Sequence, residues 1–194
     1  MRTPRTRYED VLVPLHGQHQ GDNASIAVCA VEEFFDAIID SEILEDAMRN
    51  VVMPGRFEVL AHQPLVIIDG AHNPAGAKVC AEVFFNDFNL DGRKILVTGA
   101  LRSRDPRELL TTFRAKEFDL VITCTPPSPR GLPANEMADV ARQVGCENVV
   151  VAESVEGACE YALEISQPDD AVLVAGSLYI VSEARPFLVS KVIK

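Results

Sequence analysis

The sequence predicts an α/β protein with a Rossmann-like, mostly parallel sheet, preceded by a shorter segment that is mainly helical. Across residues 53–194, short apolar runs typical of buried parallel strands alternate with stretches of helical length. Proline, glycine and polar residues separate the runs, and the turn residues follow the predicted strands. Strands that alternate with such helices imply right-handed crossovers, and therefore a parallel sheet.

The individual elements of residues 53–194 are predicted from local patterns. Proline is favoured in the first turn of a helix, where its missing N–H would have no partner, and Pro74, Pro106 and Pro133 each open a stretch of helical length. Strands are expected at 65–68, 94–98, 120–123, 149–151 and 171–174. Helices are expected between them, at 74–85, 106–116, 133–144 and 155–165.

Residues 1–52 show a different pattern. The predicted elements are a strand end at 11–15, a polar turn at 17–23, and helices at 24–39 and 42–51. Asp22 or Asn23 is the expected N-cap of the first helix. One strand and two helices cannot close a sheet, so this segment is expected to be the tail end of another domain that exposes apolar surface. Pro54-Gly55 marks the predicted boundary.

The composition bounds the classes of partner. The chain has 29 acidic and 18 basic residues and a formal charge of -11, which argues against a nucleic-acid-binding face. No apolar stretch is long enough to span a membrane. The five cysteines are scattered singly, without metal-ligand spacing, and most are expected to be buried. Their odd number and the absence of a signal peptide favour the reducing cytoplasm.

Polar residues follow two of the predicted strands, where open α/β sheets bind ligands. Asp69 could accept a hydrogen bond from a ribose hydroxyl or could serve as a turn residue. His72 could shuttle a proton, pair with a carboxylate or bind a metal, or simply be a hydrogen-bonded turn residue. Asn73 is most simply an N-cap. Ser177 lies outside a nucleophile-elbow motif, so binding is its expected role.

Three further side chains are candidates for binding a nucleotide. Arg56 could bind phosphate or carboxylate, although a surface arginine is the simpler reading of its position. The amides of Gln20 and Asn23 match the edge of adenine, with turn formation and capping as the alternative. The sequence contains no G-x-x-x-x-G-K-[ST] phosphate loop, so a triphosphate would need most of its phosphate site elsewhere.

Taken together, these motifs resemble those of Mur-type ligases. Residues 15–24 (LHGQHQGDNA) resemble the segment that closes the central ATPase domain, in the form with His-Gln found in folylpolyglutamate and dihydrofolate synthases. Residues 54–58 (PGRFE) and 69–74 (DGAHNP) resemble two signatures of the C-terminal domain, and residues 176–179 (GSLY) resemble its last signature. The resemblance implies that residues 1–52 end the central ATPase domain and that residues 53–194 form the Mur ligase-like C-terminal domain.

The resemblance implies an ATP-dependent amide ligase that joins L-glutamate to a folate or dihydropteroate carboxylate through an acyl phosphate. Gln20 and Asn23 would contact the adenine, Arg56 the phosphates and Asp69 the ribose. The N-terminal ATPase domain of the family carries the phosphate loop and most Mg²⁺ ligands, so no metal ligand is expected here. We therefore expect a portion of a longer ligase that is inactive alone and binds ATP weakly or not at all.

The same resemblance places His72, as a catalytic and glutamate-binding residue, and Ser177 near the incoming glutamate. Four of the site residues are expected to contribute little to folding stability, namely Arg56, Asp69, His72 and Ser177. Two alternatives stay open. One is the C-terminal portion of a peptidoglycan-precursor ligase, and the other is a non-catalytic α/β module that binds a small molecule or a protein.

Overall fold

The computed structural model describes residues 1–192 and divides into two compact units, Met1–Pro54 and Gly55–Lys194. Each unit is described by itself below. None of the helices that the structure describes is both long and apolar enough to cross a membrane.

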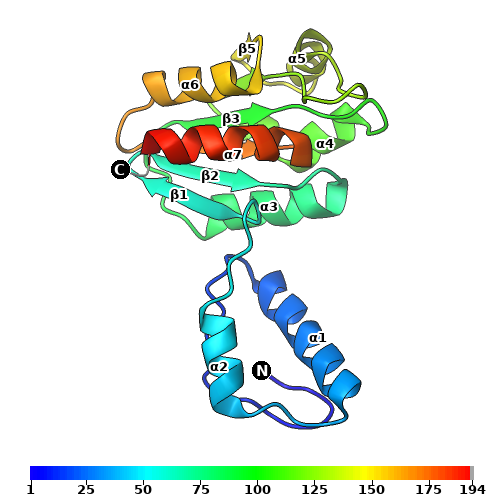
Figure 1. The fold of residues 1–194 in the computed structure, drawn as a ribbon. Coiled ribbons are helices and arrows are strands. Elements are labelled where there is room, and N and C mark those ends of the chain that lie inside the picture. The colour runs from blue at the N-terminus through cyan, green and yellow to red at the C-terminus, as the bar shows by residue number, and fades with distance from the viewer. Residues whose placement is uncertain (193–194) are drawn as a thin grey trace. The chain divides into compact units, whose positions relative to one another are not determined.

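The second unit is an α/β domain built on one sheet (Figure 1). Its described strands are β1 (Glu58–His62), β2 (Leu65–Asp69), β3 (Lys94–Thr98), β4 (Leu120–Thr123), β5 (Val149–Val151) and β6 (Ala171–Ala175). Their order across the sheet is β1-β2-β6-β3-β4-β5, and every pair except β1–β2 is parallel. The predicted mostly parallel sheet is confirmed, with the five predicted strands in place.

Strand β1 was not expected from the sequence. It is an antiparallel edge strand that pairs only with β2, and its register shifts between Val59 and Ala61. Only Leu60 of this strand is buried. An edge strand that is half-exposed and irregular lacks both the unbroken apolar run and the clean alternation that predict strands.

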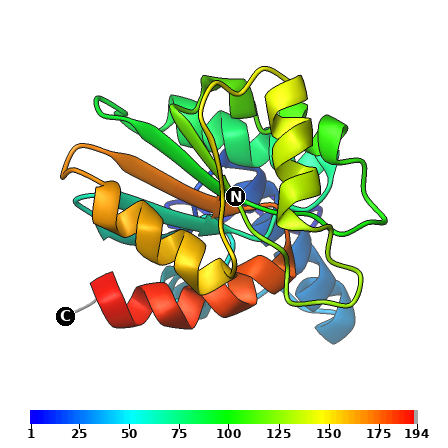
Figure 2. The same ribbon diagram turned by 90° about the horizontal axis from the view of Figure 1, so that it is seen from above.

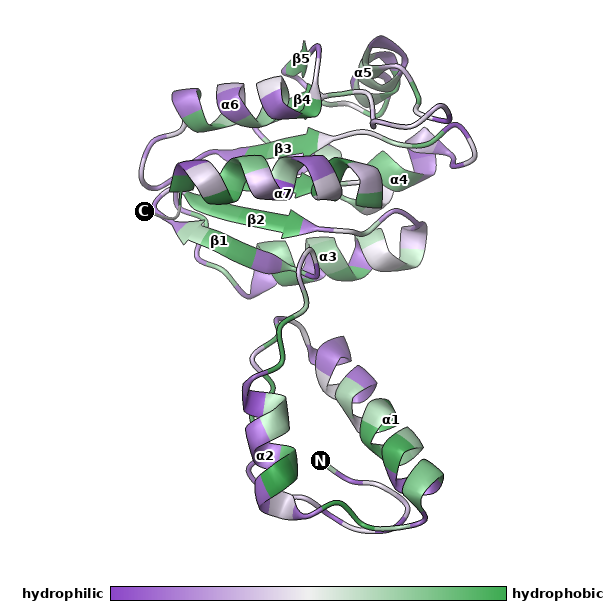
Figure 3. Ribbon diagram, viewed as in Figure 1, coloured by the Kyte–Doolittle hydropathy of each residue, from purple (hydrophilic) through white to green (hydrophobic). Residues whose placement is uncertain are grey.

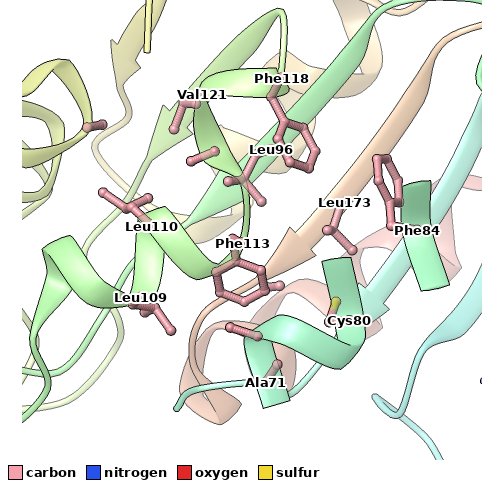
Figure 4. Close-up of a cluster of buried hydrophobic side chains, with 14 of the residues drawn as sticks. Ala71, Cys80, Phe84, Leu96, Leu109, Leu110, Phe113, Phe118, Val121 and Leu173 are labelled. Atoms are coloured by element: carbon pink, nitrogen blue, oxygen red, sulfur yellow. The ribbon is translucent and has the colours of Figure 1, made fainter. Parts of the chain in front are cut away.

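Helices cover both faces of the sheet. The helices are α3 (Pro74–Asn86), α4 (Pro106–Thr112), α5 (Ala134–Gln143), α6 (Val155–Ile165) and α7 (Leu178–Val192). Alternate residues of each buried strand face opposite layers. Ile67 of β2 joins the core under α3, α4 and α5, part of which is drawn in Figure 4. Val66 and Ile68 join the core under α6 and α7, on the other side of the sheet (Figure 2).

Two helical details differ from the sequence predictions. The helix expected at 106–116 ends at Thr112, and after Arg114 in a left-handed conformation (φ 58°) a 3-10 turn runs over Ala115–Glu117. Helix α7 was not predicted, and Pro186 lies inside it. An interior proline disfavours a helix, but burial of the α7 side chains Ile180, Val181, Ala184 and Leu188 against the sheet compensates for it.

The first unit contains two helices, α1 (Gln18–Phe35) and α2 (Ser41–Arg49). The predicted strand at 11–15 is wrong, because these residues form no strand; Pro14 among them lacks a ladder donor. The predicted turn at 17–23 is also wrong, since α1 begins at Gln18 with Gly17 as its N-cap. Asp22 and Asn23 therefore lie within the helix and are not caps.

The first unit has a small core made of Tyr8, Val28 and Leu44. Much of its remaining apolar surface is exposed, including Phe34 at 81% and Ile26 at 68%. Figure 3 shows hydrophobic residues along α1. The expectation that this segment exposes apolar surface is confirmed.

Candidate functional site

The candidate site lies at the carboxyl ends of the central strands β2 and β6. Asp69 at the end of β2 is in register with Ala175 at the end of β6, so the turns that follow both strands leave the same edge of the sheet. Asn73 caps α3, since its Oδ1 accepts a hydrogen bond from the Gly76 N–H at 2.8 Å, and this N-cap prediction is confirmed. In open α/β sheets such an edge is where ligands bind.

Backbone hydrogen bonds join three sequence motifs at this edge. The Gly70 N–H donates to the Gly55 carbonyl at 2.7 Å, which links the 69–74 turn to the 54–58 turn. The Gly176 N–H donates to the Ala71 carbonyl at 3.0 Å, which links the same turn to residues 176–179. The three motifs therefore form one continuous structure, which we call the linked turns: residues 54–58, 69–74 and 176–179.

Asp69 holds two of these segments with its carboxylate. Oδ2 accepts from the Phe57 N–H and Oδ1 accepts from the Ala71 N–H, both at 2.7 Å. The pKa of the Cys80 thiol, on α3, is raised mainly by burial and to a smaller extent by the nearby Asp69 carboxylate. The half-buried Asp69 thus has a clear structural role, and these contacts replace the expectation that it contributes little to stability. Its role toward a ribose stays a prediction.

Arg56 lies at the tip of the 54–58 turn and is exposed. The residues on either side have positive φ, 69° at Gly55 and 44° at Phe57. A Cβ on Gly55 would come within 2.6 Å of Val181 Cγ1, so glycine is required both by conformation and by space. Among the ion pairs of the described residues, none includes Arg56. Its guanidinium is therefore available to an anion.

Glu58 ends this turn, and its side chain folds back to contact the backbone of the turn at Gly55. Its Oε2 accepts from the Gly55 N–H at 2.8 Å and from Arg185 Nε at 2.9 Å, while Oε1 accepts from Arg185 Nη2 at 2.7 Å. The hydrogen-bonded Arg185 lowers the pKa of the Glu58 carboxyl more than burial raises it. Sequence reasoning missed Arg185, because nothing in the local pattern of 178–192 predicts a partner 127 residues earlier.

The contacts of His72 define which ring nitrogen is available. Nδ1 lies 2.8 Å from the Gly70 carbonyl oxygen. Because a carbonyl can only accept, Nδ1 must carry the proton, and in the neutral ring Nε2 is then left as an acceptor. The half-buried imidazole is thus oriented by the turn that carries it.

Ser177 is 2% exposed and stands at the start of α7. Its Oγ accepts from the Tyr179 N–H at 3.2 Å, so the hydroxyl proton remains available to a ligand. Gly176 before it has φ 113°, and a Cβ there would come within 2.6 Å of Thr98 Oγ1. The geometry suits a binding hydroxyl held by a tight turn.

Gln20 and Asn23 belong to the first unit and lie one turn apart on α1. Asn23 Nδ2 donates to Gln20 Oε1 at 3.4 Å, with Gln20 buried and Asn23 exposed. Both amides thus share one side of the helix. No group of three or more His, Cys, Asp or Glu side chains suited to a metal ion occurs within the described part of the chain.

Comparison with known proteins places the chain in a family. A family model described as the glutamate ligase domain of Mur ligases matches residues 55–178. A probable bifunctional folylpolyglutamate synthase/dihydropteroate synthase of Haloferax volcanii is 37% identical over 178 residues, which are 91% of this chain and 20% of that protein. The dihydrofolate synthase/folylpolyglutamate synthase of Mycobacterium tuberculosis is 33% identical and covers 92% of this chain and 40% of that protein.

A solved structure of the Mycobacterium tuberculosis folylpolyglutamate synthase, complexed with ADP and AMPPCP, superimposes with a TM-score of 0.85 at 31% identity. The match covers 93% of this chain and 42% of that one. This chain therefore spans less than half the length of each of these relatives.

The fold and the linked turns define the class first: an α/β domain in which three sequence motifs meet at the carboxyl edge of a mostly parallel sheet. More specifically, the chain belongs to the Mur ligase family, through the glutamate ligase domain of that family. The resemblance of its motifs to folylpolyglutamate and dihydrofolate synthases is confirmed by the relatives.

Proposed function

We propose that this chain supplies the glutamate-ligase part of an ATP-dependent folylpolyglutamate or dihydrofolate synthase. The observation that carries the proposal is the set of linked turns, which brings Arg56, His72 and Ser177 to one edge of the sheet through backbone hydrogen bonds. The relatives support the folate branch over the peptidoglycan branch, because those named above are synthases of folates.

In the proposed reaction, the γ-phosphoryl group of ATP passes to a pteroate or folate carboxylate, and ADP is released. The amine of L-glutamate then attacks the acyl phosphate, so that an amide forms and inorganic phosphate leaves. Such a reaction requires positioning and charge neutralisation rather than a protein nucleophile. Mg²⁺, when bound, neutralises phosphate charge, and we propose that its ligands lie mainly in the ATPase portion of the ligase.

The residues of this chain have separate proposed roles. Arg56 binds ATP phosphates with its exposed guanidinium. His72 Nε2 accepts a hydrogen bond or a proton from the glutamate amine, and the Ser177 hydroxyl donates to a glutamate carboxylate. Asp69 holds the ribose in addition to its structural bonds. In the first unit, Gln20 and Asn23 contact the adenine edge.

The test is steady-state kinetics of the complete ligase that includes this chain, with ADP release measured for each substrate. His72→Ala and Ser177→Ala are expected to raise the KM for glutamate, whereas Arg56→Ala raises the KM for ATP. Ser154→Ala is a matched control, because Ser154 caps α6 through the same kind of Oγ contact, to the Gly157 N–H at 3.0 Å, away from the linked turns. Unchanged glutamate kinetics in both site variants would refute the assignment.

A second measurement addresses the alternative of an independent binding module. Calorimetric titration of this 194-residue chain with Mg-ATP is expected to show weak binding or none, since the sequence contains no phosphate loop. The net charge of -11 also opposes approach of an anion. Micromolar affinity would instead show a complete nucleotide site in this chain and favour the module.

A further inference from the structure

We propose that Arg185 of α7 is a positioning residue that, through Glu58, holds the 54–58 turn so that Arg56 is presented to the phosphates of ATP. The inference rests on the proposed phosphate-binding function of Arg56.

The first step is the geometry of the pair. The Arg185 guanidinium meets the Glu58 carboxylate in a two-pronged contact, Nε to Oε2 at 2.9 Å and Nη2 to Oε1 at 2.7 Å. This fork fixes the orientation of the carboxylate as well as its position. The same Oε2 accepts the Gly55 N–H at 2.8 Å, so one carboxylate joins α7 to the residue before Arg56.

The second step concerns what holds Arg56. Its side chain is exposed and belongs to no ion pair in the described residues, so the backbone of the turn alone fixes where its Cα–Cβ bond starts and points. That backbone carries positive φ values at Gly55 and Phe57, and a non-glycine residue such as Phe57 adopts this conformation only when its surroundings enforce it. Asp69 holds the Phe57 side of the turn, and Glu58 holds the Gly55 side.

The third step is that the pair acts on one turn as well as on stability. The side chains of Glu58 and Arg185 are 18% and 37% exposed, and a two-pronged arginine–carboxylate contact is a kind of ion pair that does stabilise a fold. A purely stabilising role, however, does not require the same carboxylate to accept the Gly55 N–H, next to Arg56. Helix α7 also begins next to Ser177 and packs Val181 against Gly55. One helix thus holds both the glutamate-binding and the phosphate-binding parts of the proposed site.

The experiment is a double-mutant cycle in the complete ligase. Arg185→Met is expected to lower kcat/KM for ATP about tenfold, because small misplacements of binding groups have effects of this size or larger. The KM for glutamate should change by less than about twofold. In an Arg56→Ala background, Arg185→Met should add less than about twofold, because the group that it positions has already been removed. Arg185→Lys, which keeps the charge but loses the fork, should restore part of the activity.

The matched control is Arg93→Met. Arg93 also pairs with a carboxylate through two nitrogens, since its Nε and Nη2 both donate to Asp170 Oδ2, at 3.2 and 2.7 Å, but this pair lies at the opposite end of the sheet strands. Arg93→Met should leave kcat/KM for ATP unchanged. If Arg185→Met does not fold, Glu58→Gln replaces it, since glutamine keeps an acceptor for the Gly55 N–H.

Two outcomes overturn the inference and are distinguishable. If Arg185→Met has the same effect with and without Arg56, or if Arg93→Met matches it, Arg185 has only a structural role while the proposed function stands. If Arg56→Ala alone leaves ATP kinetics unchanged, the proposed role of Arg56 is wrong and the positioning role falls with it.

Discussion

Removal of the Asp69 carboxylate should destabilise the α/β unit substantially. Asp69→Ala leaves the N–H groups of Phe57 and Ala71 without their acceptor, and these residues are only 3% and 5% exposed. A hydrogen bond to a charged group contributes about 1.5–3 kcal/mol. Because Asp69 is half-buried, we take the lower value for each of the two bonds, and expect a loss of roughly 3 kcal/mol.

The assay is urea denaturation of this chain followed by far-ultraviolet circular dichroism, since the sequence contains no tryptophan to report by fluorescence. In a thermal melt of the same variant, the expected loss of stability corresponds, for a domain of this size, to a fall in Tm of roughly 6–12 °C. Asp69→Asn should have an intermediate effect, because its amide keeps one acceptor oxygen but presents a donor to the second N–H.

Asp105→Ala is the matched control. Asp105 also accepts two backbone N–H groups, from Arg107 at 2.9 Å and Glu108 at 3.3 Å, but it is an exposed cap of α4. Loss of such a cap costs about 1 kcal/mol. If Asp69→Ala destabilised the chain no more than Asp105→Ala, the argument that Asp69 ties the turns together would be refuted.

Three further outcomes are expected. Arg185, through its hydrogen bonds, lowers the pKa of the Glu58 carboxyl below its usual 4.5. The pair therefore stabilises the fold above pH 4.5, and this stability is lost as the pH falls through the lowered pKa. In Glu58→Gln, urea midpoints should fall less steeply below pH 4.5 than in the unchanged chain. Gly55→Ala should cost roughly 2 kcal/mol, from its φ of 69° and the clash with Val181, and a thermal melt with an unchanged Tm would count against this. Burial raises the pKa of Cys159 to about 12, so mass spectrometry after iodoacetamide treatment should find half-exposed Cys29 alkylated first, and equal rates would contradict the assigned burial.

Much of the α/β architecture could be predicted because its signals are local. Runs such as Leu65–Ile68 are apolar throughout, as strands buried on both faces must be, and Pro74 and Pro106 mark helix starts through their own backbone chemistry. The expected burial of most cysteines is also confirmed, with four of the five buried. The strand and helix signals depend on neighbours in the chain.

Residues 17–23 have turn composition, yet they open α1. Two other errors occurred where tertiary contacts override local preference. Residues 178–192 contain an interior proline, yet they form α7 because its apolar face packs on the sheet. Strand β1 exists because β2 offers it an edge for pairing.

The sequence by itself determined the alternation of strands and helices and the identity of the motifs that carry the family resemblance, because both are written in consecutive residues. Only the tertiary structure decided how the motifs meet. Gly55 and Gly70 are joined by a hydrogen bond across a hairpin, and Ala71 and Gly176 by one between turns more than a hundred residues apart. Such contacts depend on the order of strands across the sheet, which places β6 beside β2 although the two strands lie far apart in the sequence.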